Sequence, residues 1–113
     1  MLPRSNKINT SLFKEVLKKG KTYNFTYFSL KVLKISNGNK SRFASVVPKK
    51  FIKKAVLRNL LKRQIFNIIN EISDDINDNF VVIIFCKSET NKLSFSELKK
   101  EIIFVFKKID LLI

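Results

Sequence analysis

Apolar residues recur at intervals of three and four between Lys49 and Ile72, the longest regular pattern in the chain. This spacing fits one stripe of an α-helix, so we predict a helix over the whole stretch with one face in the protein core. The stripe consists of Leu57, Leu61, Ile65, Ile68 and Ile72. A neighbouring face carries Ala55, Arg58, Asn59, Lys62, Arg63 and Phe66.

A shorter helix is predicted near the start of the chain. Thr10 or Ser11 can cap it, and Gly20 would end it. Residues 1–9 are mostly polar and are expected to form a flexible arm.

Two strands and a turn are predicted between these helices. Residues 22–33 alternate as a strand does, and residues 42–47 form the returning strand, which Pro48 stops because proline cannot donate to a ladder. Residues 36–39 contain an Asn-Gly pair, which is typical of a hairpin turn. The two strands are therefore expected to pair.

The last third of the chain predicts a strand and a helix. Residues 80–86 are a continuous apolar run, typical of a strand buried on both faces. Ser94 and Glu97 form a capping box that opens the final helix. Its core stripe is Leu98, Ile102, Val105, Phe106 and Ile109. The order αββαβα over 113 residues indicates a single α+β domain, a two-layer α/β sandwich with a small sheet packed with helices.

Charge is distributed very unevenly. The formal net charge is +14, and residues 16–70 hold 14 Lys and Arg but no Asp or Glu. Such self-repulsion is unfavourable for folding unless a polyanion supplies the counter-charge. Nucleic acid is the leading candidate for this polyanionic partner.

Several classes of function are disfavoured by composition. Cys86 is the single cysteine and there is no histidine, so the usual zinc or iron ligands are missing and Cys86 is expected to be a core residue. Asp74, Asp75 and Asp78 lack the spacing of a calcium loop and are expected to form a solvated turn. The longest apolar run has seven residues against the ~20 of a membrane span, and no secretory signal is recognised, which predicts a cytoplasmic protein.

The cationic face of the central helix is the strongest candidate site. Arginine and lysine bind phosphate oxygens, and Asn59 can donate to and accept from a sugar or a base. Lysines near the helix start extend the positive field. The candidate RNA contacts are Lys49, Lys50, Lys53, Lys54, Arg58, Asn59, Lys62 and Arg63. The alternative is a solvated basic face on an ordinary helix. Among the aromatic residues that flank basic ones, Phe13 and Tyr27 are the best candidates for stacking on unpaired bases.

At these residues the chain resembles the bacterial ribonuclease P protein family, whose members assist a catalytic RNA that trims the 5′ leader of precursor tRNA. The matching motifs are Val47-Pro48-Lys49-Lys50, Lys53-Lys54-Ala55 and Arg58-Asn59-x-x-Lys62-Arg63, and residues 12–21 resemble the family's opening helix. Leu60 stands where the family usually has a second arginine, and Phe66-Asn67 where Arg-Glu is common.

The resemblance implies two RNA-binding surfaces and a particular fold. The eight candidate RNA contacts would bind ribonuclease P RNA, and metal-assisted catalysis with Mg²⁺ would belong to the holoenzyme. A cleft between the first helix and the sheet would bind the leader of precursor tRNA through Phe13, Leu17, Tyr27, Ser29 and Lys31. The family's βαβ crossover is left-handed. The alternatives are a ribosomal or other structured-RNA-binding protein, and a protein that lies on anionic membranes.

Overall fold

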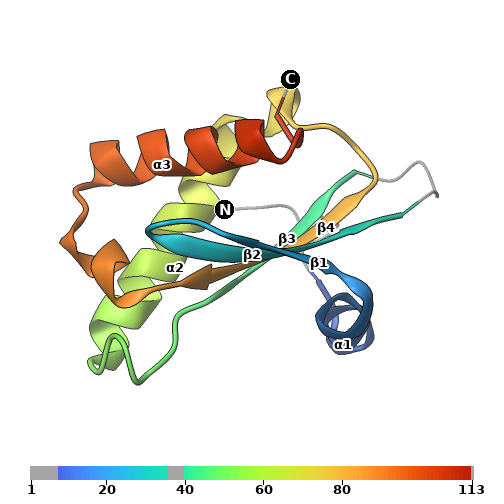
Figure 1. Cartoon of the computed structure of the whole chain (residues 1–113). Helices are drawn as coiled ribbons and strands as arrows, with labels where there is room; N and C mark the ends of the chain where they lie inside the picture. Colours follow the sequence, from blue (N-terminus) through green and yellow to red (C-terminus); the bar gives the residue numbers. More distant parts are fainter. Residues whose placement is uncertain (1–7, 36–39, 113) are drawn as a thin grey trace.

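The computed structural model describes residues 8–35 and 40–112, which form helices on both faces of one sheet (Figure 1). The helices are α1 (Thr10–Lys19), α2 (Ala55–Glu71) and α3 (Phe95–Lys108). The strands are β1 (Lys21–Asn24), β2 (Phe28–Lys34), β3 (Arg42–Val46) and β4 (Phe80–Cys86). Two 3₁₀ turns, η2 (Ser73–Asp75) and η3 (Ser88–Lys92), complete the order. The predicted α+β class is confirmed.

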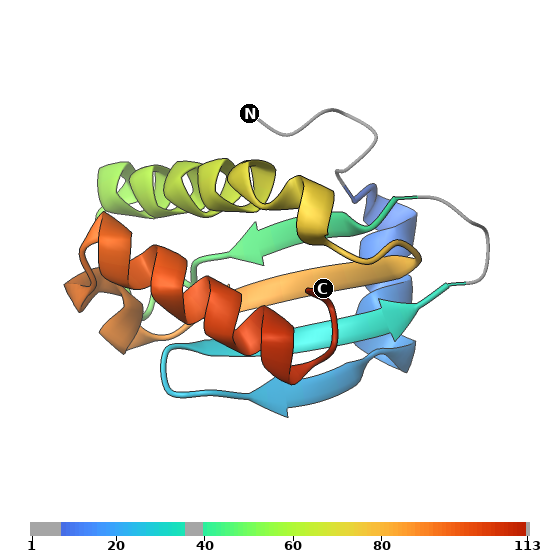
Figure 2. The same ribbon diagram turned by 90° about the horizontal axis from the view of Figure 1, so that it is seen from above.

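The sheet is mixed, with the strand order β1-β2-β4-β3. Strand β4 is antiparallel to β2 and parallel to β3, and β1 is antiparallel to β2. Helices α2 and α3 cover one face, whereas α1 covers part of the other (Figures 1 and 2). In Figure 2, the parallel strands β3 and β4 both point to the left, β4 lies below β3, and α2 lies on the face of the sheet that is turned toward the viewer. When the picture is turned so that both strands point up, β4 therefore lies to the left of β3. The β3–α2–β4 crossover is therefore left-handed, as the resemblance implied and against the common rule.

The predicted strand over residues 22–33 is wrong in one respect, because it is two strands. The Phe25 N–H donates to the Phe28 carbonyl oxygen at 2.8 Å and closes a tight turn between β1 and β2. The element order is thus αβββαβα rather than αββαβα. No glycine or proline marks this turn, so no signal in the sequence divides residues 22–33 into two strands.

The predicted pairing of the strand over residues 22–33 with the strand over residues 42–47 is also wrong. Residues 36–39, where the hairpin turn was expected, lie outside the described residues. Strands β2 and β3 are not neighbours, because β4 lies between them. Four consecutive buried residues, Val81 to Ile84, suit β4 to this central place, since both of its faces are covered.

The ends of the helices differ in detail from the predictions. Asn9, not Thr10 or Ser11, caps α1 by accepting a hydrogen bond from the Leu12 N–H at 2.8 Å. Of the expected arm, residues 1–7 lie outside the described residues, whereas Ile8 packs against the α1 side of the sheet. Gly20 ends α1 as predicted.

The capping box of α3 is confirmed, with both reciprocal hydrogen bonds between Ser94 and Glu97 present.

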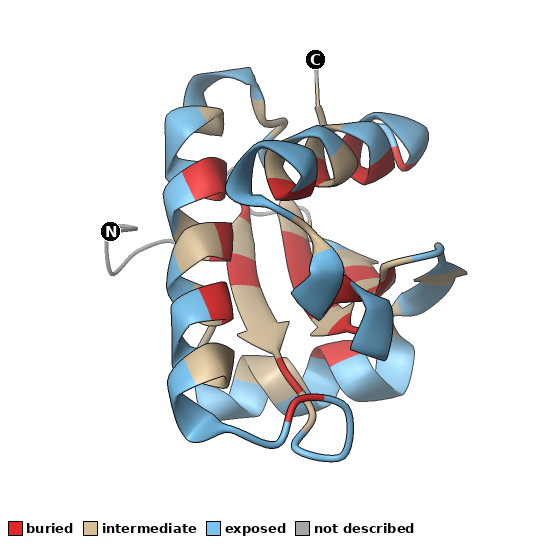
Figure 3. Cartoon of the chain, turned by 90° about the vertical axis from the view of Figure 1, so that its left-hand side faces the viewer, coloured by how far each residue is buried: buried red, intermediate tan, exposed pale blue. Residues whose placement is uncertain are grey.

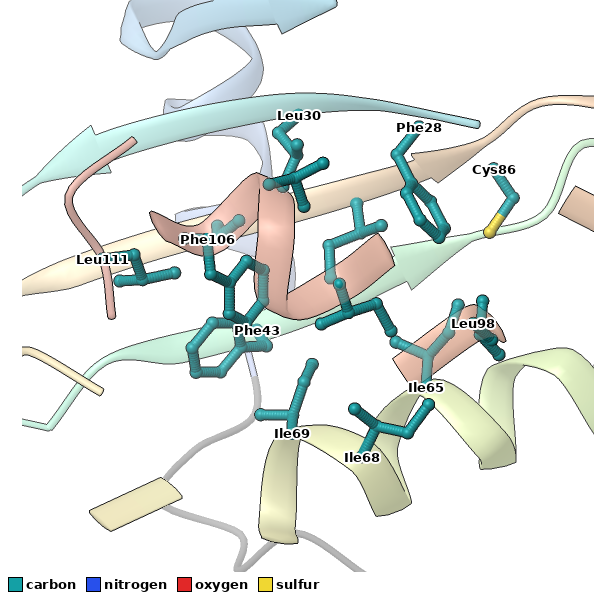
Figure 4. Close-up of a cluster of buried hydrophobic side chains, with 14 of the residues drawn as sticks. Phe28, Leu30, Phe43, Ile65, Ile68, Ile69, Cys86, Leu98, Phe106 and Leu111 are labelled. Carbon is teal, nitrogen blue, oxygen red and sulfur yellow. The ribbon is translucent and has the colours of Figure 1, made fainter. Parts of the chain in front are cut away.

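The main core lies between the sheet and helices α2 and α3 (Figure 4). Phe43 of β3 stacks on Phe106 of α3 with ring centroids 5.8 Å apart. Ile65, Ile68 and Ile69 of α2 are fully buried against them. A smaller cluster of Val16, Val81 and Ile83 joins α1 to the opposite face of the sheet. Within the described ranges, no helix combines the length and apolar character that crossing a membrane requires.

Candidate nucleic-acid interface

Helix α2 separates apolar from polar side chains as its sequence predicted. Leu61, Ile65 and Ile68 are buried, and Leu57 and Ile72 pack partly buried against the same core. Figure 3 shows the buried turns of α2 on the side that faces the sheet and exposed residues on its outer side. The cationic face, defined here as Arg58, Asn59, Lys62 and Arg63, lies at the surface, with Asn59 and Arg63 exposed and Arg58 and Lys62 half-buried.

The helix is shorter than predicted, because Lys49 to Lys54 precede it. The Pro48 carbonyl oxygen accepts hydrogen bonds from the N–H groups of Phe51 and Ile52, both at 3.1 Å, and forms a tight turn. Ile52 is only 3% exposed and anchors this turn in the core. We name residues 48–54 the lysine turn. Its four lysines, Lys49, Lys50, Lys53 and Lys54, are all exposed.

The Arg58 guanidinium connects the lysine turn to α2. Its Nη1 atom donates to the carbonyl oxygens of Ile52 at 3.0 Å and Lys53 at 2.7 Å. Arg58 is therefore partly engaged with the backbone, which the sequence did not reveal. The spacing of Arg58 from Lys53 places the two within reach of each other, but only the structure gives the direction of the side chain.

The charges of α2 oppose its own dipole. Lys54 is the N-cap residue and makes no side-chain capping bond, and the first turn has no acidic residue. Glu71 occupies the last turn, which has no basic residue, and Asp74 and Asp75 follow in η2. A helix normally favours the reverse arrangement. The positive end of the helix thus adds to the field of the lysines, and the acids gather at the other end, about 25 Å away.

A second candidate surface lies on the α1 side of the sheet. Ser29 and Lys31 point away from the main core, because they alternate with the buried residues Phe28 and Leu30. The Lys31 Nζ donates to the Leu17 carbonyl oxygen at 3.0 Å, so Lys31 also provides a hydrogen-bond donor to the last turn of α1. Phe13 packs against the smaller cluster on this same face.

Phe85 belongs to this surface and was missed by the sequence reasoning. It lies opposite Ser29 in the register of β2 and β4, and its ring packs against the smaller cluster while remaining half-buried. Its signal in the sequence is its place two residues after Ile83, which is fully buried beneath α1. We name Phe13, Leu17, Ser29, Lys31 and Phe85 the α1-side surface.

Tyr27 does not join the α1-side surface. It precedes β2 and packs against the main core on the other side of the sheet. A cavity of about 370 Å³ lies at the start of α1 and contains none of the predicted leader-binding residues. It is lined by Asn9, Ser11, Leu12, Glu15, Ile35 and Arg42.

The described residues offer neither an accessible reactive thiol nor a cluster of three metal-type ligands. Cys86 is 1% exposed, and burial raises the pKa of its thiol to about 12 despite the opposing charge of Lys62. A protonated thiol is a poor nucleophile, so Cys86 is a core residue as predicted. Residues 8–35 and 40–112 contain no group of three His, Cys, Asp or Glu side chains that could hold a metal ion.

Comparison with known proteins identifies the family. The family model for Ribonuclease P matches residues 2–110. The ribonuclease P protein component of Pseudanabaena sp. is 35% identical over 99 residues, which cover 87% of this chain and 85% of that protein. The Listeria welshimeri component is 35% identical over 95 residues, covering 84% of this chain and 79% of that protein.

Solved structures agree with this fold. The Staphylococcus aureus RNase P protein superimposes with a TM-score of 0.86 at 20% identity, covering 97% of this chain and all of that one. The Thermotoga maritima RNase P protein gives a TM-score of 0.80 at 23% identity, covering 90% of this chain and 96% of that one. Because the family match spans nearly the whole sequence and the relatives align along most of their own length, the chain belongs to the ribonuclease P protein family.

Proposed function

We propose that this subunit binds the catalytic RNA of ribonuclease P through the lysine turn and the cationic face of α2. The observation that carries the proposal is the gathering of seven lysine and arginine side chains at one end of α2, in a stretch of sequence without a single acid. Lysines act as point charges and Arg63 as a planar fork, and both neutralise phosphates. Asn59 adds an uncharged donor and acceptor for a ribose or a base edge.

The α1-side surface is proposed to bind the single-stranded 5′ leader of precursor tRNA. The half-buried rings of Phe13 and Phe85 suit stacking on unpaired bases, and Lys31 supplies a positive charge beside them. Binding of the leader would favour the precursor over the mature product, which has lost that segment. Tyr27 is less suited to this role, because its ring packs on the other side of the sheet.

Hydrolysis is assigned to the RNA partner. Mg²⁺ would supply Lewis-acid chemistry and an activated water when bound in the holoenzyme. Asp74, Asp75 and Asp78 form no group of three metal ligands within the described ranges, and we place the Mg²⁺ with the RNA phosphates in this proposal. The protein's part is therefore to reduce repulsion between two RNAs and to hold the substrate.

The proposal is tested by precursor tRNA cleavage with the partner RNA at low Mg²⁺, with and without the protein. We expect the protein to lower the Mg²⁺ concentration needed for cleavage. A protein that binds the RNA but leaves cleavage unchanged would contradict the role in tRNA maturation.

The two surfaces are separated by a pair of variants. Phe85→Ala should weaken binding of precursor tRNA to the holoenzyme and leave binding of mature tRNA unchanged. Arg63→Ala should instead weaken assembly with the catalytic RNA. Equal effects of Phe85→Ala on precursor and mature tRNA would contradict the placement of the leader.

A further inference from the structure

The lysine turn carries four positive charges within six residues, and their repulsion disfavours a single compact conformation unless other contacts stabilise it. Lys49, Lys50, Lys53 and Lys54 repel one another, and Lys54 at the start of α2 also faces the positive end of the helix. The turn is anchored by the paired hydrogen bonds to Pro48, the buried Ile52 side chain and the bond from the Arg58 N–H to the Lys54 carbonyl oxygen at 3.1 Å. None of these backbone bonds ends on the carbonyl oxygen of Ile52 or Lys53.

Arg58 supplies this missing contact. One guanidinium nitrogen, Nη1, donates to two successive carbonyl oxygens, those of Ile52 and Lys53, and thereby holds the two peptide groups on either side of Lys53. Hydrogen bonds from a charged donor are stronger than neutral ones. The cation also lies where two carbonyl dipoles point, which offsets part of its repulsion from the lysines.

We infer that Arg58 is a positioning residue, which acts on RNA mainly by holding the lysine turn in place. The inference rests on the proposed function, since it concerns how the same surface binds RNA. Lys50 and Lys53 contribute more to RNA affinity when their backbone is ordered before binding, because ordering it during binding lowers the net affinity. On this reading, loss of Arg58 weakens the contacts of neighbouring lysines as well as any contact of its own.

Hydrogen exchange of the free protein tests the structural half of the inference. The amides of Phe51 and Ile52 report on the turn, because both donate to the Pro48 carbonyl oxygen. Arg58→Ala should accelerate their exchange and leave the amides of β4 unchanged. The matched control is Arg63→Ala, which removes an equal charge from an exposed position of the same helix and should leave the turn protected. Unchanged protection in Arg58→Ala would overturn the inference.

If Arg58→Ala also accelerates hydrogen exchange of the β4 amides, Arg58→Lys is measured in its place. That variant keeps the charge but lacks the fork, and its ammonium reaches less far than Nη1. Faster exchange at Phe51 and Ile52 with an intact β4 supports the positioning role, and full protection contradicts it.

A double-mutant cycle with the catalytic RNA tests the functional half. If Arg58 positions Lys53, the affinity loss of Arg58→Ala combined with Lys53→Ala should fall short of the product of the two single losses by about threefold or more, within the range of directly coupled residues. Independent phosphate contacts would give multiplicative losses, which overturns the inference. If neither single variant alters RNA affinity, the proposed function fails, whereas the exchange experiment still decides the role of Arg58 in the turn.

Discussion

Leu61 and Arg63 lie two residues apart on α2, yet the structure predicts opposite consequences for their loss. Leu61 is 7% exposed and packs in the main core, so Leu61→Ala removes three buried carbons. At about 0.8 kcal/mol per carbon this amounts to roughly 2.4 kcal/mol before any cavity is counted. Incomplete collapse around the cavity brings the expected loss to about 2–5 kcal/mol.

Arg63 is exposed, and Arg63→Ala should change the free energy of unfolding by no more than about 0.5 kcal/mol. Its effect should appear in RNA binding instead. Loss of one phosphate contact lowers the slope of log affinity against log salt by about 0.9 for duplex RNA treated like duplex DNA, or about 0.7 for a single strand.

Thermal unfolding and salt titrations distinguish the two variants. Leu61→Ala should lower Tm by about 8–20 °C, taking about 4 °C per kcal/mol for a domain of this size. Asn67→Ala is the control, because it changes an exposed, uncharged residue four positions further along the helix and should alter neither quantity. An equal loss of Tm in Arg63→Ala and Leu61→Ala would refute the division of α2 into a core face and a cationic face.

Three further predictions concern the rest of the fold. Ser94→Ala should destabilise the protein by about 0.5–2 kcal/mol in urea unfolding, because it removes the hydroxyl oxygen that accepts from the Glu97 N–H at the start of α3. The Ser94 backbone N–H donates to the Glu97 carboxylate and lowers its pKa, so the contribution of Glu97 to stability is present above its unfolded pKa and is lost as the pH falls through its folded pKa; a Glu97→Gln effect that does not shrink in acid would contradict this. Cys86 should react with a thiol reagent at pH 8 only as fast as the protein unfolds, and rapid reaction of the native protein would show that the thiol is accessible. Lys31→Met should cost about 1 kcal/mol, since it removes the donor to the Leu17 carbonyl oxygen, and an unchanged urea midpoint would mean that this bond adds nothing to stability.

The sequence predicted the helices of this fold better than the pairing of its strands. Helical periodicity is local, so the core faces of α2 and α3 were predicted almost residue by residue. Strand pairing is a long-range property, and an Asn-Gly turn signal wrongly favoured pairing β2 with β3. The continuous apolar run of Phe80–Cys86 held the contrary signal, because a strand covered on both faces belongs in the middle of a sheet.

The start of α2 illustrates a different limit. Periodicity extended the helix back to Lys49, but Ile52 turns into the core from a non-helical segment instead. The bond from Arg58 to the turn could not be predicted from the sequence either, since it depends on the direction of one side chain. The half-burial of Phe85 likewise depends on where α1 stops covering the sheet.

The reversed charges of α2 link these features to the proposed role. Glu71 at its C-terminus is compensated by an ion pair with Lys99 of α3 at 2.8 Å. Placing cations at the N-terminus of α2 costs each of them about 0.3–1 kcal/mol. Buried isoleucines such as Ile65 and Ile68 hold the helix in spite of this. An RNA phosphate at the lysine turn would convert the repulsion into attraction, so the bound state recovers what the free protein lacks. Because the folded chain gathers these cations on one surface and should bind RNA more tightly than the unfolded chain does, the RNA should raise the stability of the protein with its concentration.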